Sequence, residues 1–156
     1  MKFTQADTTP APAAKFENVG DTITGTVLNV ETHYEVRYGA THSDGTAKRY
    51  TDDANDPDIV KSKKGRPRPQ WIIKVATDQR DATIEDDEGH RTIWAKWSQV
   101  YPIQDAGFAI GIDDTDDMPG CLLTLTVIGL KDYGLGNPGK VYTAKLERQA
   151  PDLDAF

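Results

Sequence analysis

Alternation of apolar and polar residues is the main pattern along this chain. Over residues 22–27 every second residue is a threonine, and the residues between them are Ile23, Gly25 and Val27. A period of two is typical of a strand with one buried face, so we expect a first strand from Gly20, with residues 33–39 continuing it across a bend. Similar apolar segments predict four more strands, over residues 70–78, 91–97, 121–132 and 141–147.

A single helix is expected, over residues 98–111. Pro102 suits its first turn, and Gly107 and Gly111 limit its length. The order is therefore three strands, a short helix and two strands. This order predicts an all-β fold, a five-stranded OB-fold Greek-key barrel with the helix between the third and fourth strands.

The 156-residue chain has the length of one domain. Residues 1–17, rich in Thr, Ala and Pro, predict a flexible lead-in to a domain over residues 18–148. Gly, Asp, Asn and Pro interrupt every apolar pair over about residues 40–69, which predicts a long loop. Residues 149–156 form a short acidic tail.

The cysteine content and the hydropathy pattern predict a cytoplasmic protein. Cys121 is the single cysteine, which excludes an internal disulfide and fits a reducing compartment. No apolar run approaches the roughly 18 residues that a membrane span needs, and the first residues lack a signal-peptide core. We therefore expect no membrane association.

A basic block stands out in this acidic chain, whose formal net charge is -7. KSKKGRPRPQW, residues 61–71, holds five cations within eight positions and ends at Trp71. The cations are Lys61, Lys63, Lys64, Arg66 and Arg68. One interpretation is a loop that neutralises phosphates; the other is a solvated loop folded against the acidic residues 52–58. Arg66 and Arg68, beside prolines at the mouth of a strand, are the better placed for fixed phosphate contacts.

The tryptophans favour the first interpretation. Side chains on a strand alternate between its faces, so Trp94 and Lys96 share one face if Ile93 and Ala95 point into the core. On the preceding strand the same argument turns Lys74 outward and Trp71 inward. Trp97, at the strand end, fits either face. An exposed indole beside lysines is a stacking platform for unpaired bases, so Trp94 is the principal stacking candidate.

The last predicted hairpin adds a second group of basic and aromatic residues. Lys131, Tyr133 and Lys140 surround its glycine-rich turn, whereas Tyr142 shares a face with apolar residues and is expected in the core. The loops between the first two and the last two strands form the binding rim of OB-folds. Both loops are basic and aromatic here, as a groove for single strands requires.

Motifs and residue clusters typical of enzymes are weakly represented in this sequence. GLGNPG is not followed by a helix, so it is no dinucleotide fingerprint, and the three histidines lack zinc-ligand spacing. Two acidic clusters could hold Mg²⁺ for a nuclease, but neither has the spacing of an EF-hand and both are expected to be turns. They are Asp86, Asp87 and Glu88, and Asp113, Asp114, Asp116 and Asp117. We therefore expect neither catalysis nor a metal or other cofactor.

Three segments carry a resemblance to a known family. VGDTITGTVLNVE, GRPRPQWIIKVATDQRD with EDDEGHRTIWAKW, and GNPGKVYTAKLERQAP span most of residues 19–151. They resemble the single-stranded DNA-binding proteins encoded by actinobacterial phages. The resemblance implies an OB-fold that coats single-stranded DNA in replication and recombination, in the cytoplasm of the host. It also implies that the binding hairpin carries Arg66, Lys74, Arg80, Trp94 and Lys96.

The C-terminal PDLDAF predicts a second binding element. Asp152 and Asp154 alternate with apolar residues, and Phe156 ends the chain beside its own carboxylate. An aromatic ring with a carboxylate is suited to a basic-rimmed pocket on a partner. The segment is similar to the tip of bacterial single-strand binding proteins, although Ala155 stands where a proline is expected. This similarity implies that replication or recombination proteins are the partners.

Together these patterns predict a sequence-independent single-stranded DNA-binding protein that acts by phosphate neutralisation and base stacking. We expect it to be a homo-oligomer. The alternative is an OB-like protein-interaction or virion-associated module whose basic loop docks an acidic protein surface.

Overall fold

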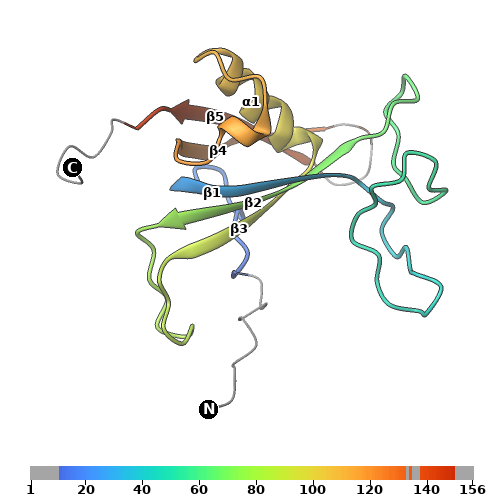
Figure 1. The fold of residues 1–156 in the computed structure, drawn as a ribbon, viewed down its shortest axis with the longest axis horizontal. Coiled ribbons are helices and arrows are strands. Elements are labelled where there is room, and N and C mark those ends of the chain that lie inside the picture. The colour runs from blue at the N-terminus through green and yellow to red at the C-terminus, as the bar shows by residue number, and fades with distance from the viewer. Residues whose placement is uncertain (1–10, 133, 135–137, 150–156) are drawn as a thin grey trace.

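The computed structural model describes residues 11–132, 134 and 138–149. Their five strands form one antiparallel sheet in the order β3-β2-β1-β4-β5, accompanied by one α-helix (Figure 1). The elements are β1 (Thr22–Tyr34), β2 (Pro69–Thr77), β3 (His90–Ala95), α1 (Trp97–Phe108), a short 3-10 helix (Thr115–Asp117), β4 (Leu122–Lys131) and β5 (Gly139–Glu147). The predicted all-β class with one short helix is confirmed.

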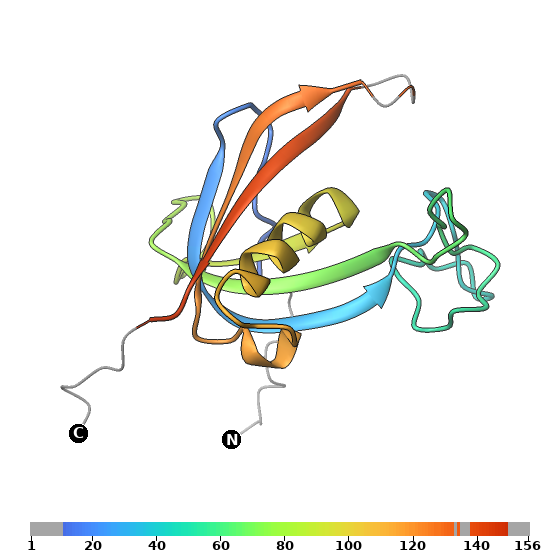
Figure 2. The same ribbon diagram turned by 90° about the horizontal axis from the view of Figure 1, so that it is seen from above.

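The long strand β1 turns the sheet because it changes partners along its length. Thr22–Thr26 pair with β4, and the ladder with β2 runs from Gly25 to Tyr34. A bulge between Val27 and Asn29 adds local twist. Figure 2 shows the consequence: β4 and β5 diverge from β1 and β2, and α1 lies in the angle between them.

The core fills this angle, and the predicted alternation on β1 is confirmed. Ile23 and Val27 are buried, as are Leu123 and Leu125 on the paired strand β4. Gly25 is needed for the close approach of β2, because a Cβ there would lie 2.7 Å from the carbonyl oxygen of Ala76. The helix contributes a buried face to the same core, consisting of Gln99, Val100, Ile103 and Gly107.

Residues 11–16 occupy the free edge of β3. The Thr92 amide donates to the Pro12 carbonyl and the Ala14 amide to the Thr92 carbonyl, both at 2.8 Å. Phe16 then packs edge-on against Tyr142 of β5, at 5.5 Å between ring centroids, and its carbonyl accepts from the Lys140 ammonium. The sequence predicts a flexible lead-in through residue 17, but the unpaired backbone groups of a strand edge bind this segment. It links β3 to β5, which share no ladder within the described residues.

The helix begins one residue earlier than predicted, at Trp97, and ends at Phe108. The Gln99 side chain accepts from the Lys96 amide at 3.3 Å, which stabilises the start. Pro102 therefore lies in the second turn rather than the first, and Trp97 belongs to α1 rather than to the end of a strand. Within the described residues, no helix is long and apolar enough to cross a membrane.

A buried ion pair holds the turn between β2 and β3. The Arg91 guanidinium donates to both carboxylate oxygens of Asp87 at 2.8 Å, and both side chains are 6% exposed. The amides of Asp81 and Gly89 also donate to Asp87. The Arg91 hydrogen bonds come first among the causes that hold the pKa of Asp87 well below its usual range, with the amides adding to them.

We expect Asp87→Asn to lower the melting temperature at pH 7, because Arg91 would lose a buried charged partner. A carboxyl whose pKa is depressed by folding stabilises the fold above its unfolded pKa, about 3.9, and this contribution is lost as the pH falls below that value. Thermal unfolding of both proteins should therefore differ at pH 7 and converge in acid. The matched control is Asp86→Asn, at an exposed neighbouring carboxylate. A constant difference down to pH 2 would contradict the assignment.

Candidate nucleic-acid interface

The β1–β2 loop, residues 35–68, projects from one end of the sheet (Figure 1). Its basic part folds into a tight hairpin in which the Gly65 amide donates to the Ser62 carbonyl and the Ser62 amide to the Arg66 carbonyl, each at 2.8 Å. Gly65 adopts φ 78, the left-handed conformation that this three-residue turn requires. Lys63 and Lys64 consequently stand exposed at the tip of the basic hairpin, residues 61–67.

The acidic turn of the same loop binds other cations. The Lys48 ammonium lies 3.1 Å from Asp56 and 2.9 Å from Asp58, and Arg37 reaches Asp58 at 2.9 Å. The hydrogen bond from Lys48, followed by that from Arg37, lowers the pKa of Asp58; Asp58 and then Asp56 raise the pKa of Lys48. Within the described residues the basic hairpin makes no ion pair, so its cations are not neutralised by residues 52–58.

Trp71 and Trp94 lie on opposite faces of the sheet, as predicted. Trp71 is buried in the core, whereas Trp94 is half-buried on the outer face, opposite Ile72 of β2. The Arg49 guanidinium carbon lies 4.9 Å from the centre of the Trp94 ring. This distance is a cation–π contact, so an arginine of the β1–β2 loop covers the indole.

A second arginine–tryptophan pair involves the first residue of α1. Arg68, at the end of the loop, stacks on half-buried Trp97 with its guanidinium carbon 5.0 Å from the ring centre. Between the two tryptophans in sequence, the Lys96 ammonium lies 3.2 Å from a Glu35 carboxylate oxygen. The Lys96 side chain remains 57% exposed, whereas that of Glu35 is 10% exposed. Lys96 therefore presents its charge to solvent although it has a carboxylate partner.

His33 and Tyr50 anchor the covering segment, residues 48–52. Their rings are stacked at 3.7 Å between centroids and 20° between planes. Asp52 approaches the His33 Nδ1 at 2.5 Å, and Thr51 exchanges backbone hydrogen bonds with Tyr34. Sequence reasoning missed Arg49, Tyr50 and His33, although the run Lys-Arg-Tyr inside an acidic loop was a signal for the first two.

Two further predicted cations are exposed. Lys74 lies on the outer face of β2 opposite Thr92, and Arg66 stands at the base of the basic hairpin. Arg80, however, lies beyond the other end of β2, where its guanidinium donates to the carbonyls of Thr77 and Gln79.

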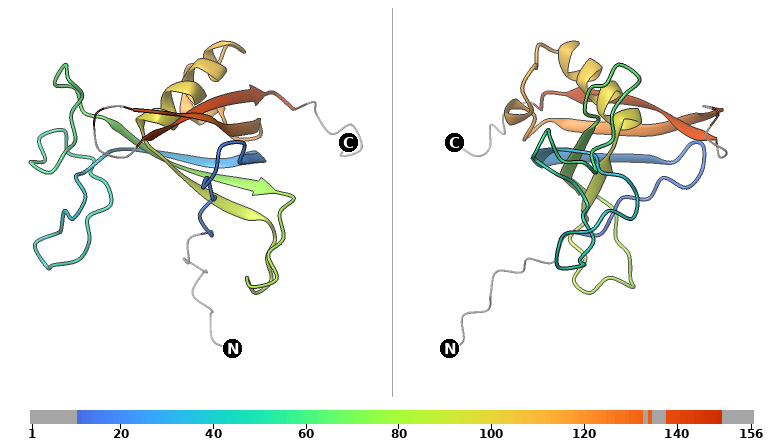
Figure 3. Two further views of the ribbon diagram at one scale, coloured as in Figure 1. Left: turned by 180° about the vertical axis from the view of Figure 1, so that it is seen from behind. Right: turned by 90° about the vertical axis from the view of Figure 1, so that its right-hand side faces the viewer.

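The β4–β5 hairpin carries the other predicted group of basic and aromatic residues. Figures 2 and 3 show its end on the same side of the molecule as the β1–β2 loop, and in Figure 2 the start of α1 lies between the two. Lys131 is exposed there, but Lys140 is half-buried and directs its ammonium to the Phe16 carbonyl. Tyr142 packs against the core, as expected. Tyr133 and the predicted tail contacts Asp152, Asp154 and Phe156 lie outside the described residues.

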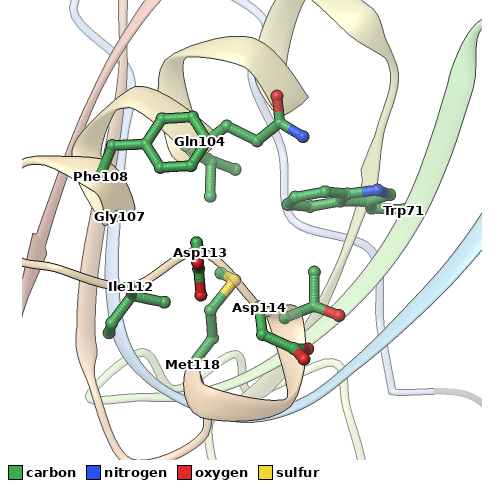
Figure 4. Close-up of a pocket in the computed structure, with 10 residues that line it drawn as sticks. Trp71, Gln104, Gly107, Phe108, Ile112, Asp113, Asp114 and Met118 are labelled. Carbon is green, nitrogen blue, oxygen red and sulfur yellow. The ribbon is translucent and has the colours of Figure 1, made fainter.

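A small pocket on the core side carries no comparable chemistry. It has a volume of about 60 Å³, between the C-terminal half of α1 and residues 112–118, with Trp71, Phe108 and Met118 among its walls (Figure 4). Lysine and arginine are absent from the described residues of its lining, so the pocket offers no cation to a phosphate. Within the described residues, no three His, Cys, Asp or Glu side chains gather closely enough to bind a metal ion.

No family model matches the chain, and neither curated proteins nor solved structures give a significant match. The structure pairs Arg49 with Trp94, Arg68 with Trp97 and Glu35 with Lys96, and the two tryptophans and Lys96 follow one another closely in sequence at the end of β3 and the start of α1. Aromatic planes beside exposed cations bind flat rings and anions, which are the two parts of a nucleotide.

We expect Lys48→Met to loosen the β1–β2 loop without unfolding the domain, because Lys48 joins two carboxylates of the acidic turn. Trypsin should then cleave the basic hairpin several-fold faster, while the melting temperature changes little. Lys145→Met is the matched control, since Lys145 pairs with Glu147 on β5 and its side chain is 70% exposed. Equal cleavage of the two variants would mean that backbone hydrogen bonds alone hold the loop.

Proposed function

We propose that this protein binds single-stranded DNA without sequence preference, through the outer face of β1–β3 and the β1–β2 loop. The observation that carries this proposal is that an arginine covers each of two tryptophans at the end of β3 and the start of α1, Arg49 on Trp94 and Arg68 on Trp97, with Lys96 between the two rings in sequence. Base stacking on aromatic rings is tolerant of sequence because every base has a flat face. Duplex bases are already stacked, so such a surface favours unpaired strands.

The charge distribution supports this function despite the net charge of -7. Several carboxylates form ion pairs with cations of the same chain, among them Asp56, Asp58 and Asp87. The basic hairpin makes no ion pair with described residues, is exposed, and is followed directly by Arg68, which lies over Trp97. Phosphates approaching the tryptophans therefore meet unneutralised cations, whose binding releases counterions.

The topology supports an OB-type domain as the framework. The order β3-β2-β1-β4-β5, with α1 between β3 and β4, has the neighbours of a five-stranded Greek-key barrel. Residues 11–16 lie along β3 and contact β5, where such a barrel closes. With the resemblance to phage single-stranded DNA-binding proteins, this favours a role in coating DNA during replication and recombination.

The first test replaces the stacking ring. Trp94→Ala should weaken binding to oligothymidine by ~10–100-fold, because each base stacked on an aromatic ring contributes about 1–3 kcal/mol. Mobility shift and fluorescence titrations measure the affinity, and circular dichroism verifies the fold. Tyr101→Ala, at an exposed aromatic residue of α1, should leave the affinity unchanged.

Wild-type protein that ignores oligothymidine at low salt would overturn the proposal. Recovery of a protein partner by the same preparation would then favour the interaction module. Equal affinities for duplex and single strands would exclude stacking on Trp94 as the basis of recognition.

The second test concerns Glu35, which neutralises Lys96. Glu35→Gln should release this cation for phosphate contact and steepen the slope of log affinity against log salt by about 0.7 for a single strand. Glu147→Gln is the matched control, because Glu147 pairs with Lys145 on β5, 3.1 Å away. An unchanged slope in Glu35→Gln would place Lys96 outside the phosphate path.

A further inference from the structure

Arg49 occupies the position that a base would need on Trp94. Its guanidinium carbon is 4.9 Å from the ring centre, which is a contact distance that leaves no space for a second flat ring between them. A base stacking on this face must therefore displace the guanidinium.

The surroundings of Arg49 allow that displacement. Its side chain is exposed and makes no ion pair with any described residue. Its backbone is held on both sides, because Lys48 binds the acidic turn and Tyr50 stacks on His33. The segment thus stays in place while the side chain is free to turn.

We propose that Arg49 is a place-holder for a base on Trp94 and becomes a phosphate ligand when single-stranded DNA binds. This inference rests on the proposed function and assigns Trp94 and Arg49 to one nucleotide unit. The base takes the indole face, and the displaced guanidinium, still tethered beside it, pairs with the adjoining phosphate. Arginine suits both roles, since its planar cation stacks on aromatic rings and binds phosphate oxygens in pairs.

The displacement of Arg49 from Trp94 requires a base, so it distinguishes a complete oligonucleotide from a sugar-phosphate backbone without bases. An abasic oligomer offers phosphates without rings, so it should bind the cations and leave the Arg49–Trp94 contact intact. Tryptophan fluorescence of the wild-type protein should therefore change with oligothymidine and stay constant with an abasic oligomer of equal length.

Arg49→Lys provides the decisive variant. Lysine keeps the charge for phosphate but stacks less well on tryptophan, so oligothymidine should bind about two- to fivefold tighter and the abasic oligomer equally well. Arg49→Met, which removes the charge, should lower the salt slope by about 0.7. The matched control is Arg148→Lys, outside the loop and after β5, where the guanidinium donates to the Ile110 carbonyl; it should change neither affinity.

Equal or weaker binding of oligothymidine by Arg49→Lys would overturn the place-holder role while leaving the proposed function intact. An unchanged salt slope in Arg49→Met would remove the phosphate contact. Wild-type protein that binds neither oligomer would instead overturn the proposed function itself, and this inference with it.

Discussion

The change of partners along β1 is the constraint on which the rest of the structure depends. Gly25 and Thr26 pair with β2 on one side and with β4 on the other, so both ladders meet at these residues. The absence of a side chain at Gly25 lets the Ala76 carbonyl approach closely. Because β1 leaves β4 behind after this point, its second half extends with β2 away from the body and carries the β1–β2 loop.

This extension creates the outer face that holds the candidate site. Without the return of the β1–β2 loop, no arginine would cover Trp94 on the outer face of the sheet. The return depends on side-chain contacts of residues 48–52, chiefly the stacking of Tyr50 on His33 and the binding of Lys48 to Asp58. Carboxylates of this acidic chain thereby stabilise the loop by ion pairs with the Lys48 side chain. The cations of the basic hairpin are left exposed to solvent.

The succession of elements along the chain and the faces of residues were predictable from the sequence because they follow from local periodicity. The alternation around Ile93 and Ala95 placed Trp94 outside and Trp71 inside without any knowledge of the fold. Boundaries were less predictable: Trp97 begins α1 because the Gln99 side chain accepts from the Lys96 amide, a contact that leaves no periodic signal. Residues 11–16 have a composition typical of disorder, yet they bind the free edge of β3.

The amino-acid sequence by itself determined the class of fold, the central position of the tryptophans and the presence of a basic segment in an acidic chain. The tertiary structure decided which cation meets which ring. Arg49 and Trp94 lie 45 positions apart in the sequence, and only the folded loop brings them into contact. The same holds for Glu35 and Lys96. The period of the sequence predicts the face of the sheet on which a residue lies. A contact between a loop residue and a residue at the end of a strand depends instead on the path of the loop.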